Sequence, residues 1–228
     1  LHRGTLLSQK FMRNELLSEN EWISLKETIA IYRQRLYDIS WLMASLSEPI
    51  ARQANKEDGC TGRFWEGRFK SQALLDDAAV LSCMAYVDLN PIRAKMAKTP
   101  ETSAHTSIQK RTEAIQQHKR QPHKLFPFVG NPRQDMPQGI AFLLQDYCEL
   151  VDTTGRIIRA DKAGAIDSAH SPILSRLGLS EEQWITLTTE FEQHFCYAAG
   201  AEHMMKDFKI HTHRKRIGGM RQAKRLLS

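Results

Sequence analysis

The stretch Asp76-Asp-Ala-Ala-Val-Leu-Ser-Cys-Met-Ala-Tyr-Val-Asp-Leu-Asn90 predicts a helix near the middle of the chain. Its two acidic residues favour a helix N-terminus, because carboxylates complement the helix dipole and cap free N–H groups. The helix should continue through Tyr86 to about Asn90, since Pro91 disfavours helical geometry at the residue before it. The preceding segment 63–75 is aromatic and partly alternating, which predicts a strand with its approach loop.

The rest of the pattern predicts a mainly α-helical chain with one or two strands. Helical segments are expected at 1–17, 21–46, 139–151, 172–179 and 180–195. After Met96 the composition shifts to Thr, Ser, Pro, Gln and Lys, which is typical of a linker. We therefore expect a first domain at 1–98, a linker at 99–135, a helical extension at 136–204 and a basic tail at 205–228 that is ordered only on a partner.

The overall composition excludes some classes of protein. No apolar run among the 228 residues reaches the roughly 18 residues that a membrane span needs. The spacing of the four cysteines fits neither a zinc knuckle nor a dense disulfide framework. We therefore expect a cytoplasmic protein with reduced thiols.

The net charge of +6 is concentrated in two basic zones. Residues 205–228 hold eight basic residues against one acidic residue, and residues 93–124 hold eight against two. Such zones commonly contact phosphates, and they also occur as solvated segments that keep a protein soluble. Charge alone does not distinguish DNA, RNA and anionic lipid.

Two patterns could carry chemistry. His211-Thr-His213 could hold a divalent metal on a strand, although the basic residues that follow it would oppose a cation. Tyr86 is the one tyrosine with an amide, Asn90, four residues later, and with Arg93 and Lys95 just beyond. That spacing suits a tyrosine nucleophile with a nearby ligand, and it also suits a half-buried core tyrosine.

Two strings together carry a family resemblance. Gly62-Arg-Phe-Trp-Glu-Gly-Arg-Phe-Lys-Ser71 and Met84-Ala-Tyr-Val-Asp-Leu-Asn-Pro-Ile-Arg-Ala94 resemble, in order and spacing, the motifs of HUH-type single-tyrosine transposases of the insertion-sequence-200-like class. The closest likeness is to their REP-associated bacterial branch. The resemblance covers about residues 1–98.

The resemblance implies a fold and an activity. The fold would be the remnant of a ferredoxin-like α+β domain followed by a helical extension. Tyr86 matches the nucleophile that attacks single-stranded hairpin DNA, leaving a 5′-phosphotyrosine and a 3′-hydroxyl for recombination of the mobile element. Asn90 matches the amide that joins two histidines in holding Mg²⁺ or Mn²⁺, which would polarise the scissile phosphate. Related enzymes occur as monomers and as dimers.

The expected DNA contacts are basic residues near the two motifs and in the tail, together with one aromatic residue. Trp65 could stack on an unpaired base, or it could be an aromatic plug between strand and helix. The full set is Arg63, Trp65, Arg68, Lys70, Arg93, Lys95, Arg214, Lys215 and Arg216.

The chain departs from the family in one respect. The two metal-binding histidines of the family lie on a strand before the segment equivalent to Leu1, and no such strand precedes Tyr86 here. The first residue is also leucine rather than methionine. We therefore expect a C-terminal fragment that binds DNA but does not cleave it alone, the metal belonging to the complete protein.

Two other functions remain open. The chain could be a non-catalytic nucleic-acid-binding protein that uses the basic tail. It could instead be a protein-interaction domain whose contact surface lies in residues 139–195. Neither alternative accounts for the two strings around Phe64 and Tyr86.

Overall fold

The structure is a computed structural model that describes residues 5–130, 138–159 and 172–227. It is 61% helix and 3% strand, which confirms the mainly α-helical prediction. The chain forms two compact units, Leu1–Lys70 and Ser71–Ser228, which we call the first and second units. The division lies inside the segment 1–98 that the sequence suggested as one domain.

The described residues 5–70 of the first unit form three helices, α1 (Leu6–Met12), α2 (Glu19–Leu36) and α3 (Ile39–Glu57). A capping box between Ser18 and Glu21 starts α2, and Lys10 of α1 pairs with Glu21 at 2.7 Å. Pro49 lies inside α3 without ending it. Gly59 and Gly62 follow α3 with positive φ angles, which favour glycine.

The single helix expected at 21–46 is wrong, because the chain turns between α2 and α3. The Asp38 side chain accepts a hydrogen bond from the backbone N–H of Ser40 at 2.8 Å and caps the start of α3. A short polar side chain of this kind competes with the continuing helix for backbone donors. The hydrophobic periodicity on both sides of Asp38 concealed the break.

Few side chains of the first unit are shielded from solvent. Leu25 is the one buried residue among residues 5–70. Local contacts support the helices instead, such as the edge-to-face pair of Phe11 and Trp22 and the guanidinium of Arg35 at 3.9 Å from the ring centroid of Trp41.

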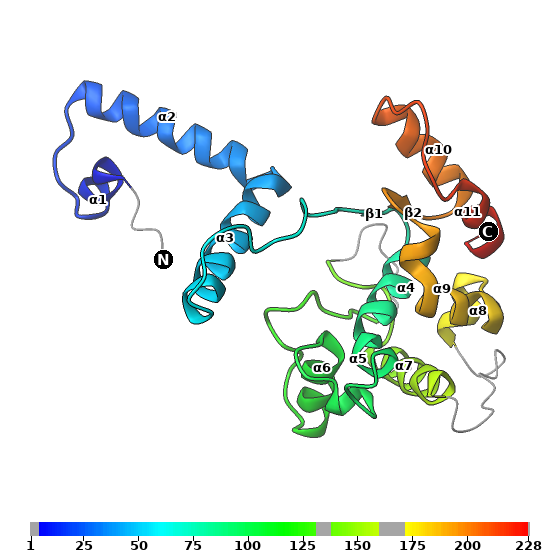
Figure 1. The fold of residues 1–228 in the computed structure, drawn as a ribbon. Coiled ribbons are helices and arrows are strands. Elements are labelled where there is room, and N and C mark those ends of the chain that lie inside the picture. The colour runs from blue at the N-terminus through cyan, green and yellow to red at the C-terminus, as the bar shows by residue number, and fades with distance from the viewer. Residues whose placement is uncertain (1–4, 131–137, 160–171, 228) are drawn as a thin grey trace. The chain divides into compact units, whose positions relative to one another are not determined.

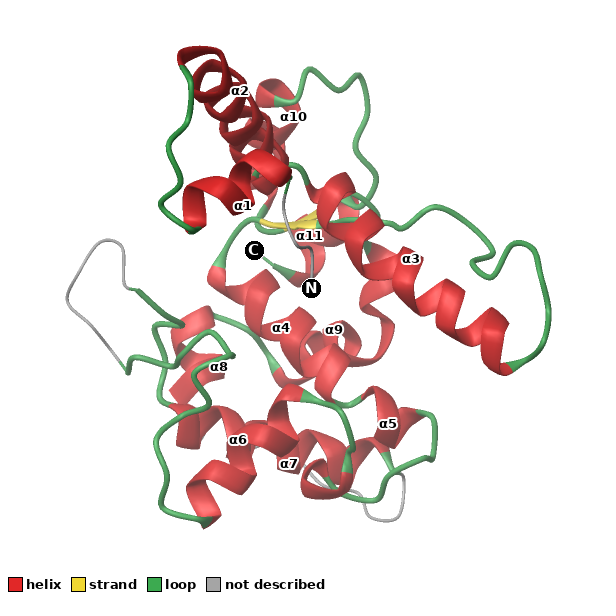
Figure 2. Cartoon of the chain, turned by 90° about the vertical axis from the view of Figure 1, so that its left-hand side faces the viewer, coloured by secondary structure: helices red, strands yellow, loops and turns green. Residues whose placement is uncertain are grey.

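The second unit holds the main hydrophobic core, and its helices can be followed in Figures 1 and 2. Helices α4 and α9 lie side by side in both views and make the most extensive helix–helix contact of this unit. The largest fully buried side chains include Trp184, Tyr147, Phe191 and Leu81. Its elements are β1 (Ala73–Leu74), α4 (Asp77–Asp88), α5 (Asn90–Arg93), the 3-10 helix η1 (Pro100–Thr102), α6 (Ser107–Gln116), α7 (Leu144–Ile158), α8 (Pro172–Leu177), α9 (Glu181–His194), β2 (Ala198–Ala199), α10 (Glu202–His211) and α11 (Met220–Leu226).

Asp76 fixes the start of α4, as its position in the sequence suggested. One carboxyl oxygen accepts from the N–H of Ala79 at 2.8 Å, and the other accepts from the N–H of Ala201 at 2.6 Å, just before α10. A Cβ added to Gly200 would lie 2.9 Å from Asp76, so this close approach requires glycine. One side chain thus ties α4 to the start of α10.

The strand expected at 63–75 forms only at its end. Ala73 and Leu74 pair in parallel with Ala198 and Ala199. A strand needs a partner for its backbone groups, and in the described part of the chain only this short β1–β2 sheet is paired as strands. The aromatic segment before it is a loop.

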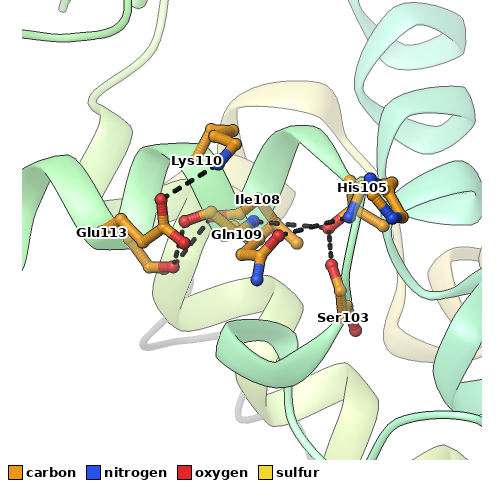
Figure 3. A network of polar contacts seen from close by, with 8 residues as sticks. Ser103, His105, Ile108, Gln109, Lys110 and Glu113 are labelled. Atoms are coloured by element: carbon orange, nitrogen blue, oxygen red, sulfur yellow. Dashed lines mark hydrogen bonds and ion pairs between the residues drawn. The ribbon is translucent and has the colours of Figure 1, made fainter.

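The segment 99–135, expected to be a linker, contains η1 and α6. Thr106 caps α6, and Ile108 on its inner face is fully buried. Figure 3 shows the polar contacts at this end of the helix, where the N–H of His105 donates to Gln109 and Lys110 pairs with Glu113. A mostly polar helix with one narrow buried face resembles a linker in composition, which explains why the sequence predicted a linker here and not a helix.

Two further segments differ from expectation. The helix expected at 139–151 begins only at Leu144, because Ile140 bridges Phe128 in an extended conformation. The described part of the tail, 205–227, is mostly helical and packs against the core rather than being irregular. Its buried apolar residues are Met205, Ile217, Ala223, Leu226 and Leu227.

A buried carboxyl group joins three helices of the second unit. Asp88, at the end of α4, accepts hydrogen bonds from the hydroxyl of Tyr147 at 2.8 Å, the hydroxyl of Ser107 at 3.0 Å and the N–H of Ile108 at 3.0 Å. Burial raises the pKa of Asp88, and these donors and the nearby Arg111 guanidinium act in the opposite direction. The carboxyl group connects α4 with α6 and α7.

We expect Asp88→Ala to lower the free energy of unfolding by about 3 kcal/mol, because it leaves three buried donors without their acceptor. Tyr147→Phe removes one of the three hydrogen bonds and should cost about 1.5 kcal/mol. Urea denaturation followed by circular dichroism measures both. Equal losses in the two variants would contradict a shared role of the carboxyl group.

The stability should also depend on pH through Asp88. Because its folded pKa is raised above the unfolded value, its stabilising contribution is complete below about pH 3.9 and is lost as pH rises through the folded pKa. Asp88→Asn removes this titration. The free energy of unfolding of the natural chain should therefore fall relative to that of the variant as pH increases from 3, and a constant difference would argue against it.

Candidate functional site

Tyr86 lies in the last turns of α4, with its side chain half-buried. The buried face of α4, including Leu81 and Ala85, packs into the core of the second unit. The ring of Tyr86 lies beside Phe191 of α9, with 6.1 Å between the centroids. The phenol is therefore held against α9, and part of it remains accessible to solvent.

Arg93 is the residue that organises the surroundings of Tyr86. Its guanidinium carbon lies 3.8 Å from the centroid of the Tyr86 ring. Nη1 donates to the backbone carbonyls of Tyr86 and Thr188, both at 2.8 Å, and Nη2 donates to Oδ1 of Asn90 at 3.2 Å. Burial lowers the pKa of Arg93, while Tyr86 and Glu192 act against that effect. The bond to Tyr86 also places a cation at the C-terminus of α4, which the helix dipole favours.

Asn90 does not lie on the same continuous helix as Tyr86. Helix α4 ends at Asp88, two residues earlier than expected, and Asn90 begins the short helix α5, with Pro91 in its first turn. The two side chains are nevertheless linked through Arg93. The phenol, the amide and the guanidinium therefore lie together as predicted. The contacts of Arg93 hold them together, and the spacing of residues on one helix does not.

The described residues around Asn90 do not fit a divalent metal ion. Oδ1, the atom that would bind the cation, already accepts from a guanidinium that would repel it. No group of three His, Cys, Asp or Glu residues that could hold a metal occurs in the described part of the chain. His211 ends α10 and His213 follows it with a positive φ, both exposed. Asn90 and its described neighbours thus do not form a metal site by themselves.

Arg63, Trp65, Arg68 and Lys70 belong to the first unit, whereas Tyr86 belongs to the second. The Nε of Arg63 donates to the carbonyl of Trp65 at 2.8 Å. The indole N–H of Trp65 donates to the carbonyl of Ser47 in α3 at 2.9 Å, and 44% of the residue remains exposed. Trp65 therefore anchors its loop to α3 and keeps accessible surface that could stack on a base.

The basic tail forms an exposed cationic surface on an ordered support. Arg214, Lys215 and Arg216 lie between α10 and α11, and all three are exposed. The Arg214 guanidinium lies 4.5 Å from the ring centroid of Tyr197. Lys95 is also exposed and lies two residues after the end of α5, with a positive φ. These cations can meet phosphates without a change in the core.

Sequence reasoning missed the residues of α9 at this site. Thr188 and Phe191 contact Arg93 and Tyr86 from a position about a hundred residues later in the chain. Their local pattern is that of an ordinary buried helix face. Nothing in the sequence near either helix indicates the contact.

Comparison with known proteins found no match among protein-family models, curated proteins or solved structures. Among the described helices, none combines the length and apolar character that crossing a membrane requires.

Proposed function

We propose that this chain is part of a bacterial, cytoplasmic, single-tyrosine transposase-type protein that binds single-stranded hairpin DNA. Tyr86 would be the nucleophile when the protein is complete. The observation that carries the proposal is the contact of phenol, amide and guanidinium at Tyr86, Asn90 and Arg93, within the second of the two family-like strings. The string Gly62–Ser71 supports it independently.

Each group has a role in the proposed chemistry. The phenol of Tyr86 would lose its proton, and its oxygen would form a bond to phosphorus while the bond to the 3′-oxygen breaks, giving a 5′-phosphotyrosine and, after the leaving oxygen takes up a proton, a 3′-hydroxyl. Arg93 carries a permanent positive charge beside the phenol, where it could meet the scissile phosphate. A metal bound in the complete protein would supply further charge for the leaving oxygen.

The DNA would contact exposed cations and aromatic surface. Arg214, Lys215 and Arg216 could follow the phosphates of the hairpin stem. In the first unit, Trp65 could stack on an unpaired base, with Arg63, Arg68 and Lys70 nearby in sequence. The two surfaces suit the double-stranded and single-stranded parts of such a substrate.

A second candidate function is nucleic-acid binding without chemistry. The ordered cationic surface at 214–216 favours it, and that surface does not depend on Tyr86. The two functions differ in their preferred ligand. A transposase-type protein should prefer stem-loops with a single-stranded flank, whereas a general binder should prefer duplex or show no preference.

We expect the chain to bind a library of DNA stem-loops with randomised 5′ flanks at least about tenfold more tightly than the same strands annealed to their complements, a difference of about 1.4 kcal/mol. Fluorescence anisotropy measures both affinities. Equal or tighter binding of the duplex would support the second candidate function.

Replacing Arg214, Lys215 and Arg216 together by Gln should weaken binding and reduce the slope of log affinity against log salt by about 3, because each lost phosphate contact on the duplex stem removes about 0.9. The matched control replaces Lys26, Arg52 and Lys56, which are exposed and change the net charge equally. Similar losses in both triple variants would show that net charge, rather than the tail, determines binding.

Incubated with Mg²⁺ or Mn²⁺ and 3′-labelled stem-loops, the chain alone should form no covalent DNA adduct, because Arg93 occupies the Asn90 oxygen and the described residues offer no other group of metal ligands. Denaturing gels detect such an adduct. An adduct that disappears in Tyr86→Phe would contradict this expectation while identifying the nucleophile.

A further inference from the structure

One side chain, that of Arg93 in α5, forms hydrogen bonds to both α4 and α9. Arg93 uses a single nitrogen, Nη1, to bind the carbonyl of Tyr86 in α4 and the carbonyl of Thr188 in α9. The same guanidinium lies over the Tyr86 ring. An ammonium group has no planar face with which to reproduce all these contacts together, so the arrangement is specific to arginine.

Helix α9 is distorted where Arg93 meets it. Glu190, two residues after Thr188, has φ −126° and ψ 19°, outside helical geometry. Helix kinks commonly occur where a side chain enters the backbone hydrogen-bond ladder, and side chains of Ser and Thr that bond back to carbonyls also bend helices. Both features occur here, since the hydroxyls of Thr188 and Thr189 bond to carbonyls one turn earlier. The kink accompanies the Arg93 contact.

The position of α9 is itself fixed by the core. Trp184 is fully buried, and its indole N–H donates to the hydroxyl of Thr154 in α7 at 2.9 Å. Leu187 and Phe191 are also buried, and Phe191 contacts the Tyr86 ring. Helix α9 therefore presents Thr188 and Phe191 to Tyr86 from a rigid support.

We propose that α9 is a structural part of the Tyr86 site and that Arg93 is a positioning residue, held by the Thr188 carbonyl, which fixes the orientation of the phenol. Within the expected helical extension, α9 thereby acquires a role, because its Thr188 and Phe191 contact Arg93 and Tyr86. The catalytic meaning of this arrangement rests on the proposed function, whereas the positioning itself does not.

The test uses the whole chain labelled with 3-fluorotyrosine, in which Tyr86→Phe identifies the ¹⁹F resonance of Tyr86 among the five tyrosines. Arg93→Met and Arg93→Lys should both shift this resonance, because neither side chain can cover the ring while bridging the two carbonyls. If the Met variant does not fold, the Lys variant retains charge and decides the question. An unchanged resonance in the folded variant would overturn the proposal.

Arg159→Met is the matched control, since Arg159 also bonds to a distant backbone carbonyl, that of Lys98. It should leave the Tyr86 resonance in place, and a shift as large as that of the Arg93 variants would overturn the proposal. Phe191→Leu tests α9 directly. Its effect on the resonance should not add to that of Arg93→Lys in the double variant, because both act on one ring. If the two shifts add exactly in the double variant, α9 is not part of the Tyr86 site.

Stem-loop DNA added to the labelled natural chain separates this proposal from the proposed function. A shift of the Tyr86 resonance with DNA, together with the variant effects, supports both. Variant effects without any response to DNA support the positioning role and count against the transposase-type function. A response to DNA without variant effects supports the transposase-type function and counts against the positioning role of Arg93.

Discussion

The carboxyl group of Asp88 is the constraint on which the second unit depends. A buried polar group is costly without hydrogen-bond partners, and this one receives three donors from α7 and from the start of α6. The three elements must therefore meet at one point with little freedom. Since Asp88 lies two residues after Tyr86, the same constraint fixes the end of α4 that carries the candidate nucleophile.

The other end of α4 is fixed in a similar way. Asp76 accepts from backbone donors at the starts of α4 and α10, so a carboxyl group holds each end of the helix. Between them, Leu81 and Ala85 pack into the core with no exposed surface. The Tyr86 site is thus built on a rigid helix, and Arg93 adds a link to a second one. Such support is what a group that must meet a phosphate with defined geometry requires.

Local signals predicted part of this arrangement. The Asp76 cap follows from short-range backbone chemistry, and it is present. The strand at 63–75 was mostly wrong, because strand formation depends on a partner that the sequence does not reveal. Helix α6 was missed because its buried face is too narrow to give periodicity. The contacts of Arg93 with Thr188 and of Asp88 with Tyr147 join positions far apart in the chain, and no local pattern encodes them.

The β1–β2 pairing has a consequence for the order in which the protein folds. Ala73 pairs with Ala198, and Asp76 binds the N–H of Ala201, so contacts at the start of the second unit need residues near its end. During synthesis these partners leave the ribosome after most of the unit, and closing so long a loop slows folding. The apolar face of α4 that packs against α9 stays uncovered until α9 has emerged from the ribosome. We expect the nascent second unit to depend on chaperones until its last segments have been translated.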